Sequence, residues 1–170
     1  MKKPKVLCLA NKSFQKSFRN WEKFIKEILN YANSQLKKTN FKLFPKIKTW
    51  ETEGIKKTYN AHLKELSQHI KKYDLIIGFT NKQLFWDRPH WCGISYGNLL
   101  IIAKYFPIKI QFLYRYGLKK LTLHEIGHFF GLSDSFFTKI SIMDNFFGMF
   151  SSKFTKKQIN TIKKFKLINT

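Results

Sequence analysis

The sequence predicts an α/β (α+β) fold: a single domain with a mixed, mostly parallel sheet of about five strands that is packed by helices. Short runs rich in β-branched and aromatic residues alternate along the chain with longer segments whose apolar residues recur at helical spacing. With 170 residues, of which 44% are hydrophobic, the chain is long enough for one core and too short for two comfortable domains.

The first half of the chain alternates strands and helices. Strands are expected at residues 6–10, 41–50 and 73–80. Pro45 lies in the second of these runs and has no N–H to donate to a sheet, so that strand is expected to be broken or to lie at an edge. Amphipathic helices are expected at residues 14–37 and 54–72. Because helices between successive strands make right-handed crossovers, these strands are expected to run parallel.

The second half is expected to add two strands, one of them antiparallel, and then two helices. The strands are expected at residues 93–104 and 108–114, and the helices at residues 117–130 and 155–167. On the helix predicted at residues 54–72, His62 and His69 lie two turns apart on one face. We expect them to be surface histidines rather than metal ligands.

The most informative segment is LHEIGHFFGLSDSFFTKISIMD, residues 123–144. Within it, His124, Glu125 and His128 form the pattern H-E-x-x-H, which on a helix is typical of a zinc site with its own general base. Four residues turn an α-helix through about 400°, so the two histidines project from one face, one turn apart. Glu125 lies about 100° around the helix, where its carboxylate can reach a water molecule on the metal.

A third ligand is needed, because catalytic zinc usually has three protein ligands. Gly131 follows the motif and can take the left-handed conformation that ends a helix and turns the chain sharply. That turn would bring Asp134 back to the metal. We therefore expect one zinc ion per chain on His124, His128 and Asp134, with Glu125 as the catalytic residue.

The full pattern H-E-x-x-H-x-x-G-x-x-D, followed by Met143 in the run SIMD, resembles the metzincin clan of zinc metallopeptidases. Asp134 as the third ligand is similar to the snapalysin-type branch, and the length of the chain is similar to that of the archaemetzincins. The resemblance implies that Met143 forms a Met-turn, a hydrophobic floor beneath the metal. It also implies one catalytic domain over residues 1–170, with an upper part of about residues 1–131 and a short lower part of about residues 132–170.

The substrate would bind beside this metal. In a metzincin-like topology, the strand that includes Gly93, Ile94 and Ser95 is expected to border the cleft as a sheet edge. An extended peptide could add to that edge by main-chain hydrogen bonds. Phe146 and Phe147 follow Met143 and are expected to wall a pocket for a large apolar side chain just after the cleaved bond.

The leading interpretation is a zinc-dependent endopeptidase that hydrolyses peptide bonds by a metal-activated water, with Glu125 as general base. Its partner would be a peptide or protein substrate. One alternative is a basic nucleic-acid-binding or scaffold protein with a non-catalytic zinc site. A different zinc hydrolase, such as an amidase, is a third interpretation.

The charge of the chain bears on these alternatives. The formal net charge is +22, and 29 of the 32 basic residues are lysines. Nucleic-acid-binding proteins rely more on the forked guanidinium of arginine. The lysines are also spread along the whole chain. Both facts favour a solvated basic surface over nucleic-acid or anionic-membrane binding, with a mild, salt-sensitive preference for acidic residues in the outer parts of a substrate.

The sequence gives little reason to expect membrane insertion or secretion. The apolar run that follows the basic amino terminus, residues 6–10, is shorter than the core of a secretory signal. No run approaches the roughly 18 apolar residues of a membrane span. The sequence as given therefore favours a cytoplasmic protein without a transmembrane segment.

Overall fold

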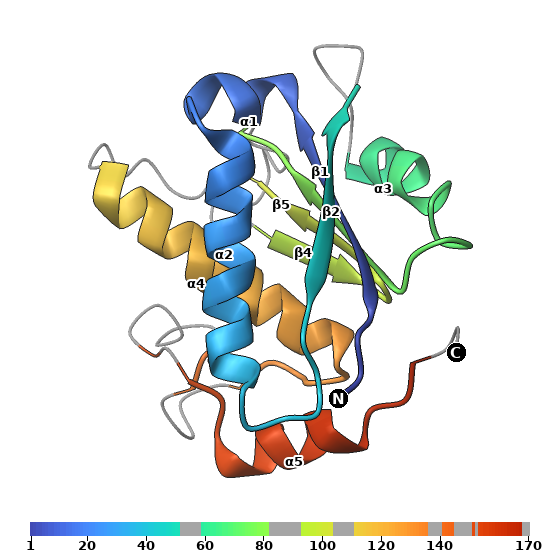
Figure 1. The fold of residues 1–170 in the computed structure, drawn as a ribbon, viewed down its shortest axis with the longest axis vertical. Helices are drawn as coiled ribbons and strands as arrows, with labels where there is room; N and C mark the ends of the chain where they lie inside the picture. The colour runs from blue at the N-terminus through green and yellow to red at the C-terminus, as the bar shows by residue number, and fades with distance from the viewer. Residues whose placement is uncertain are drawn as a thin grey trace.

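The computed structural model describes residues 1–51, 59–81, 93–103, 111–135, 141–144, 151 and 153–167. In chain order the elements are β1 (Lys5–Asn11), α1 (Lys12–Ser17), α2 (Trp21–Leu36), β2 (Phe44–Trp50), α3 (Tyr59–Ser67), β3 (Leu75–Phe79), β4 (Gly93–Tyr96), β5 (Leu99–Ile102), α4 (Gln111–Phe129) and α5 (Lys156–Lys164) (Figure 1).

The strands form one sheet in the order β2-β1-β3-β5-β4. β1 pairs in parallel with β2 and β3, β3 pairs in parallel with β5, and β4 runs antiparallel to β5. The expected mixed, mostly parallel sheet is thus confirmed. β2, which contains Pro45, ends the strand order on one side, as expected, and its Lys46 and Lys48 are exposed. β4 ends the order on the other side.

Helices cover both faces of this sheet (Figure 1). Val6 and Cys8 of β1 belong to the core beneath α2 and α4, whereas Leu7 and Leu9 pack with Leu66 of α3. The alternation follows from the strand itself, since successive side chains point to opposite faces. Each fully buried aliphatic side chain of this kind stabilises the fold by roughly 1.5–3 kcal/mol. The sheet is therefore a rigid central layer between two hydrophobic cores.

The helix expected at residues 14–37 is in fact two helices, α1 and α2. Phe18 follows α1 with an extended backbone, at φ −133° and ψ 102°, and α2 begins after Asn20. Phe14 and Phe18 are both buried, with ring centroids 4.8 Å apart. Their spacing suits one helical face, but here it serves packing on either side of a break in the helix.

The segment before the motif helix also differs from expectation. The single strand expected at residues 93–104 is the hairpin of β4 and β5, joined at Gly97 and Asn98. Gly97 has φ of 60°, which glycine adopts without strain in a tight hairpin turn. The strand expected at residues 108–114 is wrong for residues 111–114, because α4 already begins at residue 111. Tyr114 and Leu118 lie one helical turn apart there and both contact the core.

The expectation of a surface position is wrong for His62, which is only 3% exposed. Its ring packs edge-on against Trp50, with centroids 4.9 Å apart. Trp50 Nε1 in turn donates a hydrogen bond of 3.2 Å to Glu65. The histidine is thus a packing element between α3 and β2, while His69 is only partly buried.

The expected C-terminal helix is confirmed as α5, which lies below the end of α4 in Figure 1. It begins with a capping box, in which Thr155 and Gln158 each accept a hydrogen bond from the other's backbone N–H. Phe165, just after α5, packs its ring against Phe129 and Phe130 at the end of α4. Among the described residues, no helix is long and apolar enough to cross a membrane.

Candidate metal centre

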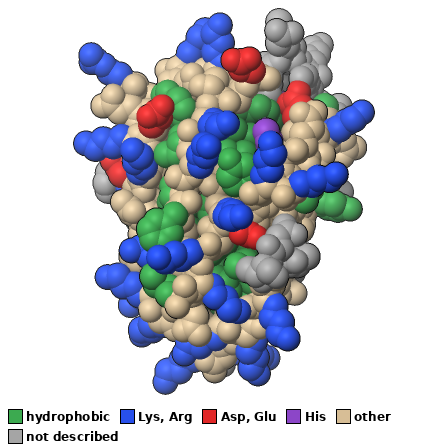
Figure 2. Space-filling model, turned by 45° about the vertical axis from the view of Figure 1, so that its right-hand side comes forward, with side chains coloured by type: hydrophobic (Ala, Val, Ile, Leu, Met, Phe, Trp, Pro, Cys, Tyr) green, Lys and Arg blue, Asp and Glu red, His purple; other side chains and the backbone are tan. Residues whose placement is uncertain are grey.

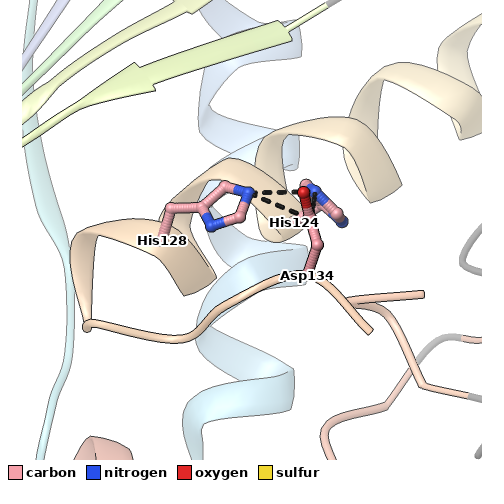
Figure 3. A group of neighbouring side chains, drawn as sticks. All are labelled: His124, His128 and Asp134. Atoms are coloured by element: carbon pink, nitrogen blue, oxygen red, sulfur yellow. Dashed lines mark hydrogen bonds and ion pairs between the residues drawn. The ribbon is translucent and has the colours of Figure 1, made fainter. Parts of the chain in front are cut away.

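The last two turns of α4 bring His124 and His128 to one face of the helix, and Asp134 meets them there (Figure 3). The two histidine Nε2 atoms are 3.2 Å apart. Asp134 Oδ1 lies 3.1 Å from His124 Nε2 and 3.4 Å from His128 Nε2. All three side chains are partly exposed, so a ligand can reach them from solvent.

Gly131 sets the turn that returns Asp134 to the helix. Its φ is 78°, in the left-handed region that glycine favours. The N–H of Gly131 donates to His128 O at 2.8 Å, and the N–H of Leu132 donates to Gly127 O at 3.0 Å. This pair of bonds is a Schellman motif, which satisfies the last carbonyls of α4 while it reverses the chain. The turn predicted from the glycine is present.

Backbone carbonyls fix the orientation of both imidazoles. His124 Nδ1 lies 2.8 Å from Ile142 O, and His128 Nδ1 lies 2.8 Å from Leu132 O. A carbonyl can only accept, so each Nδ1 carries a proton; in the neutral imidazole each Nε2 then has a lone pair that faces the common centre, and in the protonated His124 ring Nε2 donates to Asp134 instead. Burial alone would lower the pKa of His124, but the hydrogen bond to Asp134 and the charge of Glu125 outweigh it and raise that pKa.

The three ligand atoms fit a zinc ion. Zinc held tetrahedrally at about 2.0–2.1 Å separates any two of its ligand atoms by about 3.3–3.4 Å. The three separations here are 3.1, 3.2 and 3.4 Å. Two neutral imidazole nitrogens and one carboxylate oxygen are also a donor set of the kind found in catalytic zinc sites. The group could therefore hold a metal ion without rearrangement.

Glu125 lies beside this group, on the side of α4 that faces β4. Its side chain is 5% exposed. A Cβ added at Gly93 would overlap the Glu125 carboxylate and come within 2.9 Å of its Cδ and Cγ, so the carboxylate occupies space that the glycine leaves free. Burial raises the pKa of Glu125 to about 7, while His124 opposes this rise and Asp134 adds to it. A carboxyl group with a pKa near neutrality can both accept and donate a proton.

Met143 is fully buried and lies against the side of α4 opposite to Glu125. A Cβ added at Gly127, which stands between the two histidines, would overlap the Met143 sulfur and lie 3.3 Å from Phe154 Cε1. Ser135 N–H donates to Met143 O at 2.8 Å, so the segment of Asp134 is bonded to the segment of Met143. Met143 thus packs against α4 at Gly127, between the positions of the two histidines, and its role as a Met-turn stays a prediction.

The other residues singled out from the sequence are distributed differently. Gly93 and Ser95 lie on the α4 side of the sheet, whereas Ile94 packs into the opposite core with Leu99 and Ile101. The side chain of Ile94 therefore points away from the metal group, and only its main chain remains a candidate for substrate binding. Phe146 and Phe147 lie outside the described residues, so the apolar pocket stays a prediction.

The C-terminal segment supports the centre in a way that the sequence analysis missed. Gln158 Nε2 donates to Ser141 Oγ at 3.2 Å, and Ser141 Oγ accepts from Met143 N–H at 3.2 Å. Lys153 O accepts from the N–H of Ile142, whose own carbonyl holds His124. The bonds of Gln158 to Ser141 and of Ile142 to Lys153 are single polar contacts between different segments, which no periodicity or motif predicts.

On the face of the molecule that Figure 2 draws, basic side chains do not gather in one place. Figure 2 shows Lys and Arg spread over the visible face, between apolar and uncharged side chains, with few acidic groups among them. This distribution agrees with the interpretation of the lysines as a solvated surface.

Comparisons with known proteins bear on the fold. No protein-family model matches the sequence, and no curated protein sequence does. Among solved structures, archaemetzincin from Methanopyrus kandleri has a TM-score of 0.67 and 18% identity, covering 94% of this chain and 94% of that chain. A zinc-dependent peptidase from Methanocorpusculum labreanum has a TM-score of 0.60 and 14% identity, covering 92% of this chain and 99% of that chain.

Metalloproteinase-II from Bacteroides fragilis is a third similar structure, with a TM-score of 0.62 and 13% identity, covering 98% of this chain and 53% of that chain. Identities this low speak for the fold alone. The chain has a metzincin-like fold similar to that of archaemetzincin, and on it His124, His128 and Asp134 form a group that could hold a metal ion.

Proposed function

We propose that the protein is a zinc-dependent endopeptidase, with His124, His128 and Asp134 as zinc ligands and Glu125 as general base. The observation that carries the proposal is the metal group itself: three ligand atoms at the mutual distances of a tetrahedral zinc site, with a buried carboxylate beside them. The likeness to solved zinc peptidases supports the same function.

The residues of the chain would divide the work as follows. Zinc, when bound, would polarise the carbonyl of the peptide bond and lower the pKa of a water molecule. Glu125 would take a proton from that water and deliver it to the nitrogen of the departing amine. Its burial beside β4 brings its pKa to about 7, where both transfers are efficient.

β4 would hold the substrate. It ends the strand order, and its first residue, Gly93, lies against Glu125. A peptide that paired with this strand through main-chain hydrogen bonds would pass the catalytic carboxylate in an extended conformation. Main-chain pairing would place many different sequences in the same register, which suits an endopeptidase.

The test combines metal analysis with cleavage of a mixed peptide library. The zinc-loaded wild type should cleave internal peptide bonds. Glu125→Gln keeps the size of the side chain and removes the proton acceptor, so zinc should remain while turnover falls by roughly two orders of magnitude or more. Equal turnover in the two proteins would remove Glu125 from the mechanism, and a zinc-loaded wild type that cleaves no peptide would reject the proposed function.

The net charge of +22 is the reason to test one alternative function as well: a nucleic-acid-binding or scaffold protein with a non-catalytic zinc site. Such a protein should bind single- or double-stranded nucleic acid with an affinity that falls steeply as salt is raised. Salt-dependent binding together with no peptide cleavage would favour the rival.

A further inference from the structure

We propose that Gln158 of α5 is a positioning residue for the metal group. Through the turn of residues 141–144 it sets the orientation of His124 and the place of Asp134, and thereby how tightly zinc is held. The inference rests on the zinc site of the proposed function, and it names a residue outside that site that controls it. Gln158 is neither one of the three ligands nor the general base.

The turn of residues 141–144 is closed by its own hydrogen bonds. The N–H of Asp144 donates to Ser141 O at 3.1 Å, and the N–H of Met143 donates to Ser141 Oγ at 3.2 Å. A serine hydroxyl that accepts from the N–H two residues later holds a turn in one conformation. Ser141 and the two residues after it are buried, so the polar groups of this turn depend on partners within the protein.

Two consecutive carbonyls of this turn address two of the three metal ligands. Ile142 O accepts from His124 Nδ1 at 2.8 Å. The next carbonyl, Met143 O, accepts at 2.8 Å from the N–H of Ser135, the residue that follows Asp134. A shift of the turn would therefore move the His124 ring and the Asp134 segment together. The separations that suit zinc would then be lost, because both ligands move relative to the third.

Gln158 attaches this turn to α5 by using both ends of its side-chain amide. Its Oε1 accepts from the N–H of Thr155 at 2.8 Å, which completes the capping box, and its Nε2 donates to Ser141 Oγ at 3.2 Å. A glutamate would serve the capping box equally well, but only the amide adds an N–H donor. The cap fixes the side chain, so the donor is already in place for the turn.

One other hydrogen bond joins the same turn to the C-terminal segment among the described residues. The N–H of Ile142 donates to Lys153 O at 3.1 Å. Any residue at position 153 supplies that carbonyl, whereas the bond to Ser141 needs the amide of Gln158. Position 158 is therefore where the attachment depends on residue type. The coupling is reciprocal by linkage, so zinc on His124 and Asp134 should in turn hold α5 more firmly.

The experiment compares Gln158→Met with Thr155→Ala, because each removes one bond of the same capping box. Gln158→Met also removes the donor to Ser141, whereas Thr155→Ala leaves the Gln158 side chain with both of its bonds. Both variants should lower the melting temperature of the zinc-free protein by roughly a few degrees. In titrations with a competing chelator, only Gln158→Met should bind zinc about 10-fold more weakly than the wild type and release it faster. Ser141→Ala cuts the same link from the other side and should weaken zinc binding at least as much.

Hydrogen exchange gives a second readout that needs no catalysis. Zinc should slow amide exchange across α5 in the wild type and in Thr155→Ala, and much less in Gln158→Met. Equal zinc affinity in Gln158→Met and the wild type, or an equal loss in Thr155→Ala, would overturn the inference and leave the proposed function intact. The predicted effects on zinc binding, together with a zinc-loaded wild type that cleaves no peptide, would reject the proposed function and leave the inference standing.

Discussion

At the scale of single residues, the candidate site depends on glycines as much as on ligands. Gly131 turns the chain so that Asp134 reaches the histidines, and Gly93 leaves the space that the Glu125 carboxylate fills. A larger residue would disturb the site at both positions: at Gly131 because φ is 78°, and at Gly93 because a Cβ would overlap the Glu125 carboxylate. Two residues without a functional group therefore allow the side chains of the candidate site to take their positions.

Gly93→Ala should separate positioning from stability. The new methyl group meets the end of a flexible side chain, so the Glu125 carboxylate should move while β4 stays in place. A displacement on the order of 1 Å can reduce turnover by about 100-fold. We expect kcat for a library peptide to fall by about 10- to 100-fold, with zinc content and melting temperature nearly unchanged. Tyr96→Phe, on the opposite face of the same strand, is the control, and a Gly93→Ala enzyme with normal kcat would refute this role.

The sequence allowed the possible metal group of His124, His128 and Asp134 to be predicted because the spacing of its residues is local. His124 and His128 follow from one helical turn, and Asp134 follows from a turn that a single glycine can make. The hydrogen-bond partners of the two histidines have no such signal in the sequence. Ile142 and Leu132 act through backbone carbonyls, which any residue supplies, so no residue type marks them.

At the scale of elements, α4 is held between the sheet and the Met143 segment with little spare room. Gly127 is the point of closest approach on the Met143 side. The same glycine weakens the helix, because glycine in a helix interior costs about 1 kcal/mol relative to alanine. The glycine thus makes the helix less stable but allows α4 to contact Met143.

Gly127→Ala tests that account, because two effects of opposite sign compete. Better helix propensity should add about 1 kcal/mol to the free energy of unfolding, while overpacking against Met143 and Phe154 should remove about 1–3 kcal/mol. We expect a net loss, measured by urea denaturation of the zinc-free protein. In a Met143→Ala background the overlap is gone, so the same substitution should be neutral or stabilising. A stabilising effect in the wild-type background would contradict the close packing.

Prediction of the elements succeeded where hydrophobic periodicity was unambiguous. It failed where a helix or strand is interrupted and where α4 begins. The buried run of β3 and the edge position of β2 followed from residue types. The hairpin turn at Gly97 and Asn98 was missed, although glycine followed by asparagine is a recognised hairpin signal. Residues 111–114 are rich in aromatic and apolar residue types, which suit a strand as well as a helix. In the structure they begin α4, and Tyr114 packs against the core.

At the scale of the whole molecule, a fold shared with zinc peptidases is combined with an extreme charge. The TM-score of 0.67 to archaemetzincin is reached at 18% identity, so the arrangement of elements is similar while most residues differ. The net charge of +22 must cost folding free energy, because like charges come closer together in the compact state. The spread of lysines along the chain and over the face drawn in Figure 2 reduces that cost without removing it.

Added salt should therefore stabilise this protein. Raising the ionic strength from about 0.01 M to about 0.1 M shortens the screening length from about 30 Å to about 10 Å, which weakens repulsion among the lysines. We expect the melting temperature to rise by a few degrees over this range. Sodium chloride and sodium fluoride should act alike at equal ionic strength, since screening does not depend on the anion. A melting temperature that falls with salt would mean that attractive ion pairs outweigh the repulsion.

The central claim is that His124, His128 and Asp134 bind one zinc ion, and zinc titration with a competing chelator tests it most directly. The wild type should bind one zinc per chain, and Asp134→Ala, left with two ligands, should bind it at least about 100-fold more weakly. His69→Ala, a histidine away from the group, should bind zinc as the wild type does. No zinc in the wild type, or equal affinity in Asp134→Ala, would contradict the account.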